Sequence, residues 1–338
     1  MAIKSLVIHR ITRYQEDQPA ELKLRDNLLT VTADYESLLT QEKKLFNGKP
    51  GKKYGRFTDE IANAPLSNWL REVLEDKMSF LSFSQKTAES FKQHLDEQPI
   101  TLDGYLMFVL DSRADGDVFY LLFIETASGM ELSGALELET VDYINTSKLE
   151  MAARIELNDW LGDSPTEDYL VLAMSRTAAK NGDIFSKMLG YQNSIDTEKE
   201  TETLLETLEK YTKKIEGKEA AQCRKKAYDF CVEQQQIGEP VQIEQLSNYI
   251  DENEPQRFAS FAREEQSINS ETEFRPDNRK LKHLVRFTGK GNGMSLSFSS
   301  DLIQSSVHYN PANDTLTITE IPKSLKAQLA KFINQGDD

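Results

Sequence analysis

Cysteine and histidine, the side chains that most often bind metals, are scarce in this sequence. Its 338 residues include two cysteines and four histidines. Cys223 and Cys231 are eight positions apart in a helical pattern, which is too far for a disulfide within one helix. So few cysteines favour a reducing, cytoplasmic compartment. The histidines show no Cys/His/Asp clustering at the spacing of metal ligands. We therefore predict no metal site, and ordinary surface or boundary histidines at His9, His94, His283 and His308.

Long apolar runs and catalytic motifs are also missing. No run reaches the roughly 18 apolar residues of a membrane-spanning helix, and the N-terminal residues lack the features of a signal peptide. The sequence contains no G-x-S-x-G or H-E-x-x-H motif. The glycine-rich segments 48–55 and 289–293 do not match the phosphate-binding pattern G-x-x-x-x-G-K-[ST]. We therefore predict that the protein is not an enzyme and binds no cofactor.

Acidic residues, in contrast, are abundant and unevenly distributed. The chain has 56 acidic and 40 basic residues, for a net charge of −16 at pH 7. Residues 1–198 carry a net −12 and residues 199–273 a net −7, whereas residues 274–338 carry a net +3. Because an acidic surface repels nucleic acid, any contact with phosphates must come from a localised basic patch.

Two apolar runs form the predicted centre of the fold. Residues 104–110 and 118–124 are almost entirely apolar, and the pair Asp115-Gly116 between them favours a hairpin turn. We expect the runs to pair antiparallel inside a sheet that is covered on its two faces by helices at 65–76 and 79–98. Apolar and polar residues alternate over 149–157, which predicts a half-buried strand whose other face carries Glu150, Arg154 and Glu156.

The pattern as a whole predicts an α+β fold in three parts. The N-terminal domain, residues 1–195, combines a mixed or antiparallel sheet with helices. It includes a helix at 34–46 and a loop at 47–55, which its Gly and Pro residues indicate. Residues 196–273 are a helical domain, and residues 274–338 are a small, basic, antiparallel β segment.

Finer features of the last two parts follow from spacing. One helix is predicted over 197–219, with an apolar face formed by Leu204, Leu208, Tyr211 and Ile215. A second is predicted over 219–236, with an inward face formed by Tyr228, Cys231 and Val232. Tight turns are predicted at 289–293 and 311–314, and a final helix after Pro322.

Two clusters of basic residues are candidates for contact with DNA. The first, in the positive C-terminal segment, comprises Arg275, Arg279, Lys280, Lys282, Arg286 and Lys290. The second, a reserve candidate, comprises Lys49, Lys52, Lys53 and Arg56. The alternative for both is a solvated surface without a ligand, the usual role of lysine-rich loops. Neither belongs to a helix that aims Asn, Gln and Arg at base edges. The clusters therefore predict phosphate contacts to double-stranded DNA with little sequence preference.

Six stretches of the chain carry a resemblance to known proteins. They are Leu24-Arg-Asp-Asn-Leu-Leu29, Tyr54-Gly-Arg-Phe57, Phe80-Leu-Ser-Phe-Ser84, Ala153-Arg-Ile-Glu-Leu157 with Trp160, residues 185–190, and Asn310-Pro-Ala-Asn-Asp-Thr-Leu-Thr-Ile318. In this order, and over nearly the whole chain, the sequence resembles the bacterial nucleoid-associated protein family of the NdpA type. The resemblance implies a cytoplasmic location on the nucleoid and association with DNA, directly or through other nucleoid proteins. It supplies no catalytic site.

Two functional hypotheses follow. The first is a non-enzymatic nucleoid-associated protein that contacts DNA phosphates and takes part in chromosome organisation. The second is an acidic protein-binding adaptor that reaches DNA only through a basic, DNA-bound partner such as a topoisomerase. No membrane partner is expected, and the sequence alone does not fix the oligomeric state.

Overall fold

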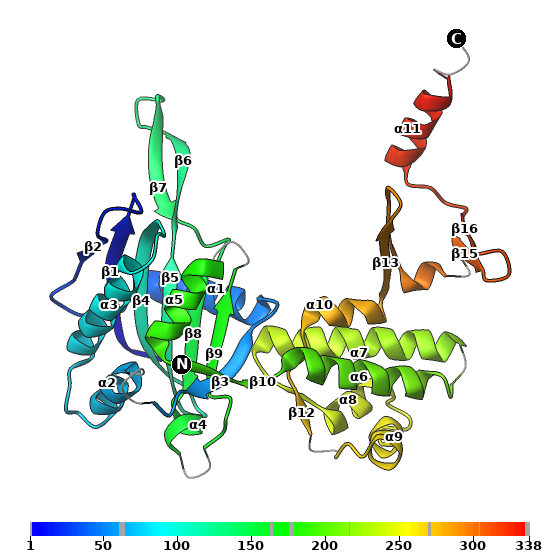
Figure 1. The fold of residues 1–338 in the computed structure, drawn as a ribbon, viewed down its shortest axis with the longest axis horizontal. Helices are drawn as coiled ribbons and strands as arrows, with labels where there is room; N and C mark the ends of the chain where they lie inside the picture. The colour runs from blue at the N-terminus through cyan, green and yellow to red at the C-terminus, as the bar shows by residue number, and fades with distance from the viewer. Residues whose placement is uncertain are drawn as a thin grey trace. The chain divides into compact units, whose positions relative to one another are not determined.

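The chain folds into two compact units with different architectures. The computed structural model describes residues 2–60, 65–162, 165–175, 179–215, 217–269, 272–303 and 305–334. The first unit is Met1–Lys199 with Gln235–Glu239, and the second is Glu200–Gln234 with Pro240–Asp338. The first is built on a sheet and the second on helices followed by hairpins (Figure 1), so the predicted α+β class is confirmed. Within the described ranges, no helix has the length and apolar character needed to cross a membrane.

One antiparallel sheet of eight strands organises the first unit. Its strands are β1 (Ala2–Arg13), β2 (Glu21–Lys23), β3 (Lys53–Phe57), β4 (Leu102–Ser112), β5 (Asp117–Ile124), β8 (Met151–Glu156), β9 (Leu170–Met174) and β10 (Tyr191–Ile195). They lie in the order β10-β3-β9-β8-β5-β4-β1-β2. The two apolar runs pair antiparallel as predicted, with Phe108 opposite Leu121. The N–H of Arg113 donates to the carbonyl of Gly116 at 3.1 Å and closes the turn between them.

Each face of this sheet has its own apolar core, because successive side chains of a strand point to opposite faces. Phe108 lies in a core with the apolar side chains of four helices, and its neighbour Met107 lies in a second core with those of one helix. The four are α2 (Pro65–Leu74), α3 (Phe80–Asp96), α4 (Leu157–Leu161) and α5 (Ala179–Leu189), and the one is α1 (Ala33–Gly48). The prediction that the helices at 65–76 and 79–98 cover the two faces is therefore wrong. Both pack on one face, and the helix predicted at 34–46 covers the other.

Two further predictions for this unit are wrong. The strand at 149–157 is buried on both faces, since Glu150 and Arg154 are only 4% and 7% exposed. The charge of Arg154 is offset by Glu156, whose Oε1 lies 3.0 Å from its Nε without the geometry of a hydrogen bond, and its guanidinium lies over the Phe46 ring. The predicted loop at 47–55 contains the start of β3, which pairs with β9 and β10. The Gly and Pro residues of this segment are typical of loops, so the sequence did not predict the strand.

A two-stranded arm follows β5. It consists of β6 (Thr126–Leu132) and β7 (Leu138–Ile144), which pair antiparallel and stand away from the sheet (Figure 1). Residues 126–144, here called the acidic arm, include four acidic and no basic residues. Its large apolar side chains are 40% to 79% exposed, and they are Met130, Leu132, Leu136, Leu138, Tyr143 and Ile144. The arm thus combines negative charge with an uncovered apolar surface.

The second unit begins with a bundle of helices around one apolar core. Its elements are α6 (Thr197–Thr212), α7 (Gly217–Ile237), β11 (Val241–Gln242), α8 (Ile243–Ile250), α9 (Arg257–Gln266), β12 (Glu273–Phe274), α10 (Asn278–Leu281) and the short 3-10 helix η2 (Lys282–Leu284). The predicted stripe is confirmed at Leu204, Leu208 and Tyr211, which are buried on α6. The helix ends at Thr212 and not at 219 as predicted, so Ile215 lies beyond it, although it packs against the same core. The inward face of α7 is mainly Cys223, Ala227 and Cys231, spaced by four; Tyr228 and Val232 are only half-buried.

After this core come two hairpins and a helix. They are β13 (Arg286–Gly291) with β14 (Met294–Ser299), β15 (Val307–Asn310) with β16 (Thr315–Ile318), and α11 (Lys323–Asn334); the 3-10 helix η3 (Ser300–Leu302) follows β14. The tight turn predicted at 289–293 is shorter than expected, since β13 continues through Gly291. The chain reverses at Asn292 and Gly293, both with positive φ, a backbone conformation that Gly and Asn accept at low cost.

Candidate nucleic-acid interface

The hairpin β13–β14 separates polar from apolar side chains. Residues directly opposite each other in an antiparallel pair lie on the same face. Arg286 pairs with Ser299, Thr288 with Ser297, and Lys290 with Ser295. One face of the hairpin therefore carries two cations and four hydroxyl groups, of which that of Ser299 donates to the carboxylate of Asp301 just after β14. We call it the basic face.

The basic face continues into α10 and η2, the two short helices that precede β13. A hollow of about 510 Å³ is lined by Arg279, Lys282, His283, Arg286 and Ser297, among others. Within it, Nη2 of Arg286 donates to Oγ of Ser297 at 3.0 Å, which orients the guanidinium along the hairpin. Cationic and hydroxyl groups around one hollow are suited to bind an anion such as a phosphate.

The structure divides the six residues of the first predicted cluster into two sets. Arg279 binds the carboxylate of Asp277. Burial acts to raise the pKa of Asp277, but the hydrogen bonds and the charge of Arg279 outweigh it, so this pKa lies below its usual value. Lys280 forms an ion pair with Glu202, and the backbone N–H of Arg275 donates to Glu200 at 2.9 Å. The side-chain cations of Arg279 and Lys280 are therefore engaged within the second unit, and the side chain of Arg275 is half-buried.

The remaining three cations, Lys282, Arg286 and Lys290, are exposed. In the part of the chain that the structure describes, none of them lies within 4.0 Å of a carboxylate oxygen. Sequence alone could not separate the two sets, because Glu200 and Glu202 lie more than seventy positions before their partners.

The reserve cluster is largely tied to its own unit. Nζ of Lys49 donates to the carbonyl of Leu149, and Nζ of Lys52 to that of Asn47, both at 2.5 Å. Lys52 is only 5% exposed, and burial lowers the pKa of Lys49. Arg56 binds both carboxylate oxygens of Asp59, and its Nε lies 2.7 Å from Glu167. Lys53 is exposed, so this cluster offers a DNA backbone fewer available cations than the basic face.

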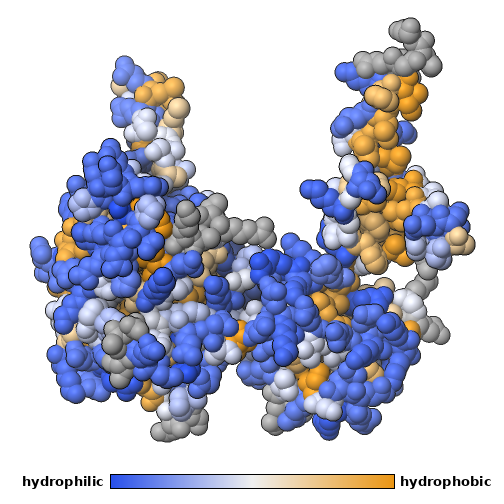
Figure 2. Space-filling model, in the orientation of Figure 1, coloured by the Kyte–Doolittle hydropathy of each residue, from blue (hydrophilic) through white to orange (hydrophobic). Residues whose placement is uncertain are grey.

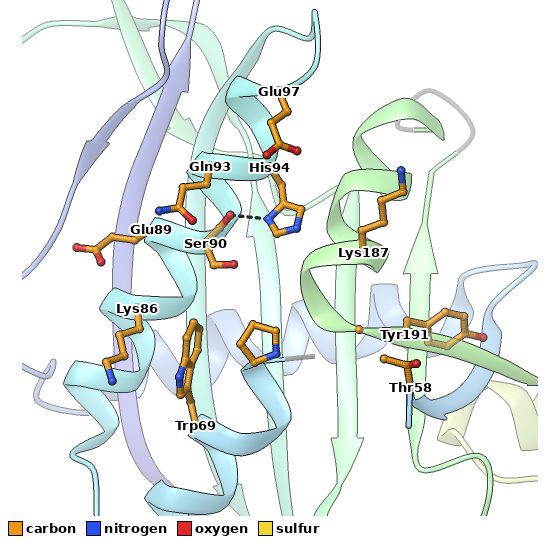
Figure 3. Close-up of a pocket in the computed structure, with 12 residues that line it drawn as sticks. Thr58, Trp69, Lys86, Glu89, Ser90, Gln93, His94, Glu97, Lys187 and Tyr191 are labelled. Atoms are coloured by element: carbon orange, nitrogen blue, oxygen red, sulfur yellow. Dashed lines mark hydrogen bonds between the residues drawn. The ribbon is translucent and has the colours of Figure 1, made fainter. Parts of the chain in front are cut away.

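A polar cleft of about 870 Å³ lies on the first unit, between α3, the N-terminus of α2 and the C-terminal end of α5 (Figure 3). Its walls carry Trp69 and His94, whose Nδ1 donates to the carbonyl of Ser90 at 2.8 Å. Its lining carries two lysines, Lys86 and Lys187, and two glutamates, Glu89 and Glu97. It therefore presents no excess positive charge to a polyanion. Among the described residues, no three His, Cys, Asp or Glu side chains are grouped to hold a metal.

His9 is not the surface or boundary residue that the sequence predicts. It is fully buried. Its Nδ1 accepts the backbone N–H of Arg25 at 3.1 Å, so its Nε2 carries the proton and donates to Oγ of Ser84 at 2.9 Å. Burial, reinforced by the charge of Arg25, lowers the pKa of His9 to about 4. The neutral ring thus connects β1, α3 and the chain after β2.

Comparison with known proteins identifies the family. The family model described as nucleoid-associated protein YejK matches residues 7–326. A nucleoid-associated protein of Aliivibrio salmonicida is 30% identical over 100% of this chain and 99% of its own. One from Azotobacter vinelandii is 29% identical over 98% of both chains, and one from Pseudomonas putida W619 is 29% identical over 98% of this chain and 99% of its own. The resemblance seen in the sequence is confirmed, and the chain belongs to the family of nucleoid-associated proteins described as YejK.

Proposed function

We propose that this protein binds double-stranded DNA at the bacterial nucleoid through phosphate contacts made by the basic face, with little sequence preference and without catalysing a reaction. Family membership supports the location and a role in chromosome organisation. The observation that carries the proposal is the set of three exposed cations, Lys282, Arg286 and Lys290, beside a row of hydroxyl groups.

The spacing of these cations suits a duplex. Arg286 and Lys290 are four residues apart on one face of a strand, a separation of about 13 Å. The major groove of B-DNA is about 12 Å wide and admits a two-stranded ribbon, so the two side chains can reach phosphates on its opposite walls. Serine and threonine hydroxyls add hydrogen bonds to phosphate oxygens without selecting a base.

The charge of the rest of the chain sets the strength of this binding. With a net charge of −16, the protein as a whole repels DNA, and only the local field of the basic face attracts it. Binding should therefore be moderate in affinity and sensitive to salt. It should be similar on duplexes of different sequence, because phosphate contacts carry no sequence information.

Charge removal tests the location of the contact. Fluorescence anisotropy on two unrelated duplexes would compare the wild type with Lys282→Gln/Arg286→Gln/Lys290→Gln. The matched control, Lys323→Gln/Lys326→Gln/Lys331→Gln, removes three exposed cations from α11. We expect only the first variant to lose most of its affinity, equally on both duplexes. Loss in the control alone, or in Lys53→Gln at the reserve cluster, would place the contact elsewhere.

A second candidate function, the adaptor, is favoured by the acidic arm. Its four acidic residues lie beside exposed apolar side chains, a combination that complements a basic protein surface. If the adaptor hypothesis is correct, purified protein alone does not bind duplex DNA but binds a DNA-bound topoisomerase. That binding should be abolished by Glu131→Lys/Glu139→Lys and retained by Lys282→Gln/Arg286→Gln/Lys290→Gln.

A further inference from the structure

The hollow beside the basic face is built on backbone that the core of the second unit anchors. Lys282 and His283, which line the hollow, belong to η2. Leu281 and Leu284, directly before and after them, are buried in the apolar core of the helices. Because this turn of chain is already fixed, a ligand that binds here does not have to order it, which favours affinity.

Cationic side chains converge on the hollow from different elements. Lys282 comes from η2 and Arg286 from β13. Nε and Nη2 of Arg286 lie 3.3 and 3.0 Å from Oγ of Ser297, which also lines the hollow. Arg279 adds a second guanidinium, whose charge is partly offset by Asp277. The described residues that line the hollow include no carboxylate, so its field attracts anions.

An anion is confined to this side of the hairpin. The opposite face of β13–β14 carries Phe287 opposite Phe298 and Gly289 opposite Leu296. Apolar side chains gather along this part of the chain in the space-filling view (Figure 2). A charged ligand is therefore directed to the face that carries Arg286.

The hollow has room for more than one phosphate group, and an aromatic side chain forms part of its wall. Its volume of about 510 Å³ lies within the range of about 300–1,000 Å³ that is typical of small-molecule sites. Tyr228 of α7 lines it and also packs against the core of the helices, which holds the ring in place. An aromatic ring beside cations is the combination that binds a nucleic-acid base together with its phosphates.

We propose that this hollow binds a nucleoside triphosphate, with the phosphates at Lys282 and Arg286 and the base against Tyr228. The phosphates of such a ligand are joined directly through bridging oxygens, so their charges are closer together than those of successive phosphates on a DNA strand. Cations that converge on one hollow match this concentrated charge. Lys290, four residues after Arg286 on β13, does not line the hollow and would contact only the duplex.

A bound nucleotide would also regulate DNA binding. Lys282 and Arg286 belong to the proposed contacts of both ligands, so the nucleotide and the duplex should exclude each other. This competition rests on the proposed function, whereas binding of the nucleotide does not.

Isothermal titration calorimetry of the full chain with ATP, in the absence of DNA, tests the site. We expect one ATP to bind per chain, with an affinity that falls as salt is added. Lys282→Gln/Arg286→Gln should weaken this binding by about 10-fold or more, because hydrogen bonds from charged donors to phosphate are lost. Lys290→Gln is the matched control. It removes an exposed cation of the same strand and should leave the affinity for ATP unchanged while it weakens binding of duplex DNA.

Inorganic triphosphate separates recognition of the base from recognition of the phosphates. Tyr228→Leu keeps an apolar side chain against the core but removes the ring, so it should weaken ATP binding by about 10-fold and leave inorganic triphosphate binding unchanged. Tyr228→Phe keeps the ring and should bind ATP like the wild type. The wild type alone also tests the base contact, because equal affinities for ATP and inorganic triphosphate would overturn the choice of a nucleotide.

Displacement of a fluorescent duplex by ATP, at constant ionic strength, tests the competition. We expect ATP to release the duplex from the wild type. A duplex that stays bound at saturating ATP would overturn the shared use of Lys282 and Arg286. A protein that binds DNA but not ATP, or whose ATP binding survives Lys282→Gln/Arg286→Gln, contradicts this inference and leaves the proposed function standing. One that binds ATP but not DNA contradicts the proposed function alone.

Discussion

Glu42 provides a quantitative test of the packing in the first unit, because its carboxyl group is buried without a partner. It lies on α1 and is 1% exposed. Within the described part of the chain, neither of its carboxyl oxygens has a hydrogen-bond partner. Burial raises the pKa of Glu42 from 4.5 to about 7. Near neutral pH the native state therefore holds a proton that the unfolded state has released.

The sign of the pH dependence follows from that difference. Because the native pKa is the higher one, the stability linked to this group is complete below pH 4.5 and is lost as pH rises through about 7. The shift corresponds to about 3 kcal/mol of unfolding free energy, at about 1.4 kcal/mol per pKa unit. About 2 kcal/mol of this loss falls between pH 5.5 and pH 8.

Urea unfolding of the wild type and of Glu42→Gln over this pH range measures the effect. Glutamine has a similar shape and does not titrate, so the variant should gain about 2 kcal/mol relative to the wild type between pH 5.5 and pH 8. Glu36→Gln, at an exposed position of the same helix, controls for the loss of one charge. Identical pH profiles for the wild type and Glu42→Gln would refute the reasoning, since they would mean that Glu42 is ionised in the native state.

The remaining predictions concern the sheet. Phe108→Ala should lower the free energy of unfolding in urea by about 2–5 kcal/mol, because it leaves a cavity at a fully buried position. A decrease of no more than about 0.5 kcal/mol, the range for surface positions, would contradict the assignment of this strand to the core. His9 should destabilise the protein as pH falls from 6.5 toward 4, because its native pKa is the lower one. The loss is about 3 kcal/mol, and His9→Gln should not show it in urea unfolding; the same pH dependence in both proteins would contradict a neutral ring in the native state.

The central sheet could be predicted from sequence because its signals are local. The runs that become β4 and β5 are apolar at nearly every position and flank an Asp-Gly turn. The identity of the covering helices could not be predicted, since α1, α2 and α3 are all amphipathic and only their packing assigns them to a face. The acidic arm went unpredicted because neither of its faces is buried, so its sequence lacks the alternation of a half-buried strand.

The sequence indicates which segment holds the candidate site, but it does not indicate which basic residues of that segment are available to a ligand. The basic residues of the C-terminal segment stand out against the acidic remainder. Which of them are available depends on ion pairs with Glu202 and Asp277, and the first of these partners is distant in sequence. The basic face itself depends on strand register, because a shift of one residue would exchange it with the face of Phe287 and Phe298.

The salt dependence of DNA binding tests the central claim most directly. Anisotropy titrations of the wild type on a duplex, over a series of salt concentrations, give a log–log slope of about −0.9 for each phosphate neutralised. Lys282, Arg286 and Lys290 are proposed to neutralise these phosphates. In the variant with all three changed to Gln, the slope should therefore be less steep, by about 0.9 for each phosphate that is no longer neutralised and by at most about 2.7. An unchanged slope in this variant, or a wild type that shows no salt-sensitive binding, would contradict direct binding through the basic face.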